Sequence, residues 1–482
     1  MSIGGATIRA AAWAFVSTAG AKVITLVGLA LLARLLAPGE FGLLAFALAY
    51  ITYADTIGDL GAGPALVYWP DRRDDAAQVT FLVSIASGLF WCLSTIALAP
   101  FIADFFNAPE GTRIVQALSL GFVLKYLGNT HDALAQKDLR FRAHVIPDLS
   151  MATVNAGLAL AMASAGWGAW SLVWGRLAGS ACRTILMWLA VPWRPTLRVP
   201  RDLFGPMLRY GRSILMVNIA AAILLNADLV AVGRFLGTTT LGLYQMAARI
   251  PEATVMVLLI VLARVLFPAL AKIHAEGRGL REPYLLVTRS ISAVTIPASL
   301  GLAALAEPIV LLFFGAQWTA SAPILRMLAI AAALQCLSWQ AGDVLKATGN
   351  AALLARIAWI RVAMLIPAVV AGAQWSAVGA ATGLVIATAI ATVLSLAVSS
   401  PIIGVRLRDM AGALFPSVAS GVVMALVVVA WTRWSGDLSP VVQVVFGVVI
   451  GAAVHVAVLA LFDRALFRQA LVLLFRPPER VQ

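Results

Sequence analysis

The chain has 482 residues, of which 61% are hydrophobic and 12% are charged, and its mean hydropathy is +0.93. This composition excludes a soluble globular domain and predicts an integral membrane protein. A formal net charge of +13 could suggest a nucleic-acid-binding protein. In a membrane chain, however, basic residues report topology, so no nucleic-acid partner is expected.

Apolar runs long enough to cross a hydrocarbon core recur along the whole sequence and predict an all-α polytopic membrane protein with about 14 transmembrane helices. The first run is too long for a signal-peptide core and lacks a clear small-residue cleavage site, so it predicts a retained helix. The predicted helices are centred near Lys22, Ile51, Phe90, Lys125, Val154, Gly179, Ala222, Met256, Pro297, Leu334, Met364, Ile386, Val422 and Ile450.

Basic residues gather in every second loop, which predicts that both termini of this multi-pass protein are on the cytoplasmic side of the membrane. The outside loops are short and leave no room for a folded outer domain. Attraction to anionic lipid is a second, open interpretation of the basic residues. The basic residues assigned to the outside loops are Arg34, Arg113, Arg234 and Arg433.

No pattern of an enzyme or a metal site occurs in the sequence. Cys92, Cys182 and Cys336 lie singly inside apolar runs, as core residues do, with no partner at ligand spacing. The phosphate-binding GxxxxGK[ST] loop, HExxH and GxSxG are all missing. We therefore expect a protein that is not an enzyme, with no cofactor and no metal ion.

Three segments recur in order at an offset of about 200 residues, as a duplication would leave them. "RLLAPGEFGLLAF" (34–46) matches "RFLGTTTLGLYQM" (234–246), "PFIADFFN" (100–107) matches "PIVLLFFG" (308–315), and "GWGAWSLVWG" (166–175) matches "QWSAVGAATG" (374–383). Six helices per half predict two parallel lobes. The predicted parts are an N-terminal lobe (1–190), a cytoplasmic linker (191–212) with a short amphipathic helix, a C-terminal lobe (213–400), and two extra helices with a cytoplasmic tail (401–482).

Two cations are predicted near the middle of the membrane, where a charge costs about 2.5–3.5 kcal/mol and needs a partner, water or a function. Lys22 lies midway along the first helix and Arg249 at similar depth in the eighth, followed by Glu252 as a local acidic partner. The duplication matches them with Ala222 and Ala49, so neither belongs to the shared scaffold. They are candidate ligands of an anionic substrate, the alternatives being an internal salt bridge or a snorkelling side chain.

Other charged residues also fall inside predicted helices. Asp55 and Asp59, one turn apart, could neutralise Lys22 or take a coupling cation, and Lys125 could join the site. Asp132 and Asp343 match between the halves, which favours a structural role. The fourth helix carries a polar stripe that should face other helices or a cavity: Gly121, Lys125, Asn129, Asp132 and Gln136. The intramembrane residues left open between ion pairing and function are Arg176, Asp228 and Arg361.

"ARLLAPGEFGLLAFA" after the first helix, "LGAGPALV" (60–67) and "QKDLRFR" (136–142) carry a family resemblance. Over about residues 5–400 the chain resembles bacterial polysaccharide and oligosaccharide flippases of the multidrug/oligosaccharidyl-lipid/polysaccharide exporter superfamily. The resemblance implies flipping of an undecaprenyl-pyrophosphate-linked oligosaccharide from the inner to the outer leaflet by alternating access. The product would serve O-antigen, capsule or exopolysaccharide biosynthesis, and the resemblance implies a location in the cytoplasmic (inner) membrane.

In related flippases, basic residues of helices one and eight line the central cavity, which implies that Lys22 and Arg249 hold the diphosphate. A proton or sodium gradient acting through Asp55 or Asp59 could reset the cycle. A polysaccharide polymerase and glycosyltransferases are the implied partners. Two alternatives stay open. A multidrug or other small-molecule exporter would favour anionic cavity residues, and a membrane polymerase or glycosyltransferase would carry a large outer loop with catalytic acids.

Overall fold

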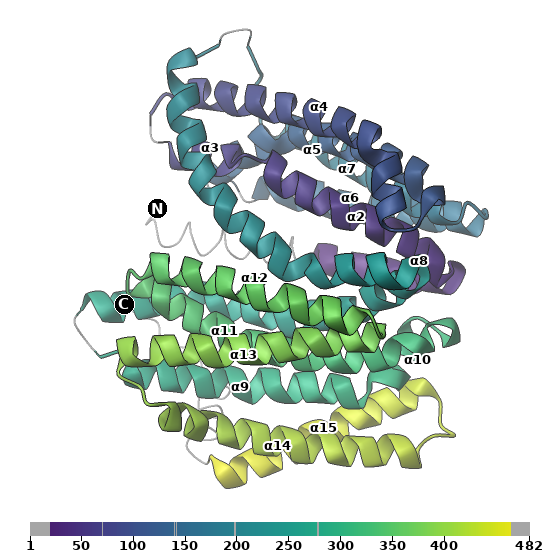
Figure 1. Cartoon of the computed structure of the whole chain (residues 1–482), viewed down its shortest axis with the longest axis vertical. Coiled ribbons are helices and arrows are strands. Elements are labelled where there is room, and N and C mark those ends of the chain that lie inside the picture. Colours follow the sequence, from purple (N-terminus) through teal and green to yellow (C-terminus); the bar gives the residue numbers. More distant parts are fainter. Residues whose placement is uncertain are drawn as a thin grey trace. The chain divides into compact units, whose positions relative to one another are not determined.

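The computed structural model describes residues 20–69, 71–138, 140, 142–196, 199–276 and 279–463 (Figure 1). Within these ranges it leaves aside the side chains of residues 213–214, 217, 256–272, 274–275, 339, 343, 346–347 and 351. The Asp343 side chain and the predicted tail from residue 464 therefore lie outside the described part. Contacts divide the chain into two units, Met1–Gly242 and Leu243–Gln482, and each is described by itself.

Unit 1 is a bundle of long helices in which the first helix (residues 20–35) is followed by a break at Leu36 and Ala37. The longest element, α8 (Arg201–Ala275), continues into unit 2 and is interrupted at Gly237, whose φ of 80° and ψ of 175° are not helical. The elements between the first helix and α8 are α2 (Pro38–Gly58), α3 (Ala62–Tyr68), α4 (Arg73–Phe105), η1 (Pro109–Gly111), α5 (Thr112–Lys137), α6 (Arg142–Ser164) and α7 (Ala169–Ala190).

Unit 2 begins within α8, and the secondary-structure elements in its described part are all helices. Its elements are α9 (Arg281–Ala304), α10 (Ala306–Phe313), η2 (Ala316–Ser321), α11 (Ala322–Ala347), α12 (Ala351–Ala373), α13 (Ala377–Ile403), α14 (Leu407–Trp434) and α15 (Pro440–Phe462). α14 packs against both α9 and α15.

Ten helices in the described part are long and apolar enough to cross a membrane. Large apolar side chains such as Phe101, Leu189 and Leu426 are about two-thirds exposed, which suits a surface that faces lipid. The predicted all-α membrane fold is confirmed. The number of 14 spans and their division into two six-helix lobes remain predictions.

Small residues allow the helices of unit 1 to pack closely. A Cβ added at Gly175 or Gly179 of α7 would lie 2.7 or 2.8 Å from a backbone carbonyl oxygen of α6, that of Asn155 or Met151. This is the small-xxx-small spacing that brings membrane helices together. The closely packed α6–α7 pair forms one wall of a cavity in unit 1.

The predicted amphipathic helix of the linker is present as the first turns of α8. Leu203 and Met207, four residues apart, are buried in a hydrophobic cluster with residues of α3, α4 and α5. The ring of Tyr210 stacks on that of Tyr68, with 4.5 Å between the ring centroids. Asp202 pairs with Arg72, and this ion pair lowers the pKa of the Asp202 carboxyl. The segment is therefore a docked helix rather than a loose tether.

Candidate substrate-binding site

The polar stripe predicted on the fourth helix lies on α5 and contacts α2 and α4. Asp55 of α2 forms an ion pair with Lys125, whose Nζ lies 2.5 Å from Asp55 Oδ2. One turn along α5, Asn129 Nδ2 donates to Asp59 Oδ1 at 3.4 Å and to Ser84 Oγ of α4 at 3.0 Å. The helical period places these groups on one face, so both predicted acids contact the same neighbouring helix.

The ion pair of Asp55 and Lys125 leaves polar groups available for further contacts. The Asp55 side chain is 27% exposed, and its second oxygen, Oδ1, is buried without a hydrogen-bond partner in the described part of the chain. The Lys125 side chain is 51% exposed. The half-exposed ammonium can bind an anion, and the unpartnered carboxylate oxygen can bind a cation.

Both residues line a cavity of about 350 Å³ within unit 1, between α2, α5, α6 and α7. The charged groups around it are of both signs, and apolar side chains of α2, α5 and α6 close the remaining wall. The lining includes Ile51, Asp55, Leu118, Phe122, Lys125, Asp132, Met151, Arg176 and Arg183. A membrane cavity lined by ionisable side chains is typical of a polar substrate pathway.

One edge of this cavity is held by an ionic network centred on Arg183 of α7. The guanidinium contacts both carboxylate oxygens of Asp132 at 2.7 and 2.8 Å, and its Nε donates to Asp148 at 2.9 Å. His144 Nε2 lies 3.3 Å from Asp132. The network joins α5, α6 and α7 with bidentate geometry, which agrees with the structural role predicted for Asp132.

Arg183→Gln is expected to lower the free energy of unfolding by about 3–5 kcal/mol, because two partly buried carboxylates would face each other without a cation. The measurement is the thermal unfolding midpoint of the detergent-purified protein. Arg113→Gln, which removes an exposed arginine at the start of α5, is the matched control and should leave the midpoint unchanged. Equal midpoints for both variants would show that the network is dispensable.

Lys22 lies in unit 1, half-buried on the first helix. In the part of unit 1 that the structure describes, no carboxylate oxygen lies within 4.0 Å of its ammonium. The structure therefore pairs Asp55 with Lys125 and not with Lys22.

Arg249 lies in unit 2, on the stretch of α8 that qualifies as a membrane span. Its Nη1 is 3.1 Å from Glu252 Oε2, the local acidic partner that the sequence offers. The two side chains are 45% and 56% exposed, so the pair is open to solvent or ligand. An exposed i, i+3 pair is weak and leaves the guanidinium available.

The other charges left open by the sequence are distributed as follows. Arg176 lines the unit 1 cavity, Asp228 accepts a hydrogen bond from the Leu229 backbone at 2.9 Å, and Arg361 is half-buried on α12. Gln136, the last residue of the polar stripe, is exposed.

Arg183, His144 and Asp148 were missed by the sequence reasoning. Arg183 follows Arg176 by seven residues, two helical turns, so the two arginines share a face of α7 and form a signal comparable to the stripe on α5.

Most of the chain matches a known protein family. Residues 31–323, more than half of the chain, match the family described as polysaccharide biosynthesis protein. The chain belongs to this family. Unit 1 lies within the match except for its first residues, so the cavity and the ionic network are features of a family member.

Two relatives span nearly the same length. The chain is 28% identical over 417 residues to the lipopolysaccharide biosynthesis protein WzxC of Escherichia coli K12, covering 85% of this chain and 84% of that one. It is 27% identical over 471 residues to the succinoglycan biosynthesis transport protein ExoT of Rhizobium meliloti, covering 96% and 94%. The similarity extends over the whole bundle.

Solved structures support the fold. The inward closed conformation of the lipid II flippase MurJ superposes with a TM-score of 0.78 at 16% identity, covering 94% of this chain and 99% of that one. An inward-facing multidrug resistance transporter of the MATE family gives 0.65 at 12% identity, covering 80% and 94%. These similarities show that the chain shares the fold of the MurJ and MATE structures.

Proposed function

We propose that this protein flips an undecaprenyl-pyrophosphate-linked oligosaccharide from the inner to the outer leaflet for O-antigen, capsule or exopolysaccharide biosynthesis. The observation that carries the proposal is the exposed Arg249 guanidinium inside a membrane span, held only weakly by Glu252. Such a cation favours an anionic substrate over the cationic substrates of multidrug exporters. The names of relatives in lipopolysaccharide, succinoglycan and teichuronic acid biosynthesis agree with this substrate class.

In the proposed mechanism Lys22 and Arg249 bind the diphosphate, the glycan occupies the aqueous interior, and the polyprenyl chain stays in lipid. Lysine offers a point charge and arginine a planar fork, so Arg249 would set the orientation of the phosphates. With the cell interior negative, outward movement of an anion gains roughly 2.3 kcal/mol per charge per 100 mV.

Two parallel six-helix lobes are part of the proposal, and matched backbone features support them. Asn107 and Gly315, which are paired by the repeat, both have positive φ (52° and 96°), and each precedes a 3-10 helix. Gly383, the match of Gly175, approaches the preceding helix in the same way, through the backbone carbonyl of Ala368. Helices 13 and 14 of the proposal correspond to α14 and α15.

Alternating access is supported by a reciprocal contact between the two repeated turns, 34–46 and 234–246. The contacting residues all belong to unit 1. A Cβ at Gly42 would overlap the Thr238 carbonyl oxygen, and a Cβ at Gly242 would overlap the Pro38 carbonyl oxygen. The two contacts are equivalent in the repeat, because Gly42 matches Gly242 and Pro38 matches Thr238. We interpret this pair of contacts, called the glycine contact below, as the closed outer side of the transport pathway.

Asp55 and Asp59 are the proposed coupling residues. Lys125 pairs with Asp55 Oδ2, and Oδ1 has no hydrogen-bond partner among the described residues, which would allow a proton or a sodium ion to compete with Lys125. The proposal places the protein in the inner membrane with cytoplasmic termini, acting as a transporter beside a polymerase and glycosyltransferases.

Reconstitution into proteoliposomes with defined lipid-linked glycans tests this function. Transbilayer movement of an undecaprenyl-pyrophosphate-linked oligosaccharide is expected, with none for a fluorescent phosphatidylcholine. Uptake of a cationic dye without movement of the glycolipid would favour the multidrug exporter. Movement of neither substrate above protein-free vesicles would refute the flippase.

A further inference from the structure

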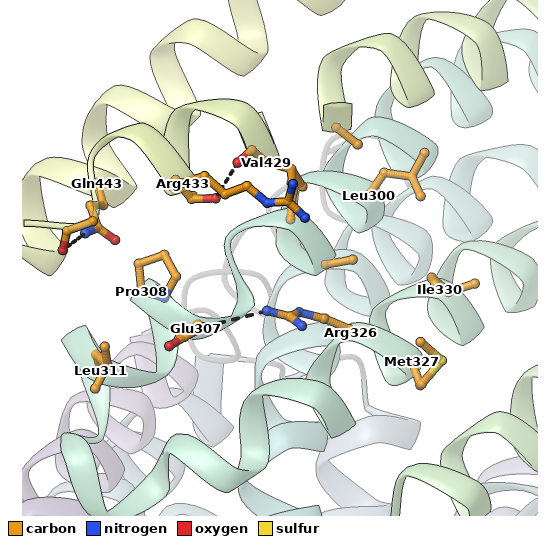
Figure 2. A pocket seen from close by; sticks show the side chains of 15 residues that line it. Leu300, Glu307, Pro308, Leu311, Arg326, Met327, Ile330, Val429, Arg433 and Gln443 are labelled. Atoms are coloured by element: carbon orange, nitrogen blue, oxygen red, sulfur yellow. Dashed lines mark hydrogen bonds and ion pairs between the residues drawn. The ribbon is translucent and has the colours of Figure 1, made fainter. Parts of the chain in front are cut away.

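Unit 2 contains a cavity of about 610 Å³ that the proposed transport function does not use (Figure 2). Its walls come from α9, α10, α11, α14 and α15. Two arginines project into it from different helices, Arg326 from α11 and Arg433 from the last turn of α14. A cavity that five elements enclose and two arginines line is a candidate ligand-binding site.

The charges of this cavity do not balance. Arg326 Nη2 lies 3.8 Å from Glu307 Oε2, beyond hydrogen-bond distance, and the two side chains are 46% and 56% exposed. Arg433 is exposed, and no carboxylate oxygen in the described ranges lies within 4.0 Å of it. Two guanidinium groups against one carboxylate leave a net positive charge, which favours an anion with several acceptor oxygens.

The cavity lies beside the turn that joins α14 to α15, where two tryptophans indicate the membrane interface. Trp434 is 79% exposed, and the Trp431 indole donates to the Gln443 carbonyl at 3.1 Å. Tryptophan is enriched at the level of lipid headgroups. The arginines are therefore placed at the depth of phosphates rather than in the hydrocarbon core.

Apolar side chains line the remainder of the cavity. Leu300 comes from α9, Met327 and Ile330 from α11, and Val429 from α14, one turn before Arg433. A cationic end joined to an apolar wall matches a molecule with a phosphate head and a hydrocarbon chain, whereas free phosphate would gain nothing from the wall.

We propose that this cavity binds an anionic phospholipid, with the phosphate between Arg326 and Arg433 and an acyl chain along the apolar wall. Glu307 competes with the phosphate for Arg326. The lipid is a resident of unit 2 and not the transported substrate, so the proposal stands whether or not the chain is a flippase.

The test is titration of the full-length protein with phosphatidylglycerol or phosphatidylcholine, followed by native mass spectrometry. Phosphatidylglycerol is expected to bind more tightly. R433Q and R326Q should each weaken its binding roughly tenfold, as expected for loss of one charge-assisted contact. E307Q should strengthen it, because Arg326 loses its competitor. R113Q, which removes an exposed arginine of unit 1, should change nothing.

The assignment would be overturned by equal binding of the two lipids, by an equal loss of binding in R113Q, or by weaker binding in E307Q. Displacement of phosphatidylglycerol by an equal concentration of glycerol phosphate would also overturn it, because the site would then recognise the phosphate alone. R433Q removes an exposed side chain at a helix end, and its thermal unfolding midpoint checks that the variant is folded.

Discussion

Arg249→Ala is expected to reduce flipping of the lipid-linked oligosaccharide by roughly 10- to 100-fold, the effect of losing a charge-assisted contact to the diphosphate. Stability should hardly change, because the removed ion pair with Glu252 is exposed and contributes only about 0.2–1 kcal/mol. The measurement is the initial flipping rate in proteoliposomes, normalised to the folded protein recovered after reconstitution.

Two further variants separate charge from geometry. Arg249→Lys keeps the cation but loses the planar fork, so it should recover part of the rate. Glu252→Gln removes the carboxylate partner and leaves Arg249 in place, so it should retain flipping. A normal rate in Arg249→Ala would remove this residue from the binding site and leave Lys22 as the candidate cation.

The sequence predicts well whatever depends on local periodicity. Apolar length predicts the membrane helices, and the spacing of Lys125, Asn129 and Asp132 predicts that one face of α5 contacts protein rather than lipid. The side chains on that face do contact α2, α4 and α7. Such predictions succeed because side-chain direction along a helix is fixed by its 3.6-residue period.

Ion-pair partners were harder to predict, because they depend on packing between segments far apart in the chain. Asp55 had Lys22 as an obvious candidate on the preceding helix, yet its partner is Lys125, 70 residues away. Arg183 reaches Asp148 because the glycines of α7 let it pack closely on α6, and it reaches Asp132 because α7 also contacts α5. A single sequence shows these charges but not which helix faces are in contact.

The glycine contact leads to the second prediction of large effect. Gly42→Ala should impair transport because its Cβ would overlap the Thr238 carbonyl oxygen, a backbone atom that cannot rotate away. Overpacking costs about 1–3 kcal/mol, which biases an equilibrium between open and closed forms roughly 5- to 150-fold. Gly242→Ala should act alike, through the Pro38 carbonyl. Gly157→Ala is the matched control, since this helical glycine has open space around it.

A crosslink distinguishes a failure to close from a general loss of stability. A Cβ at Gly39 would lie 3.3 Å from Thr239 Oγ1, so Gly39→Cys and Thr239→Cys should form a disulfide when the contact is closed. With the three native cysteines replaced, crosslinking should be efficient in the parent and in Gly157→Ala, and weak in Gly42→Ala. Efficient crosslinking in Gly42→Ala together with normal flipping would show that the two turns accommodate a methyl group, and the close approach of the repeats would then have no part in transport.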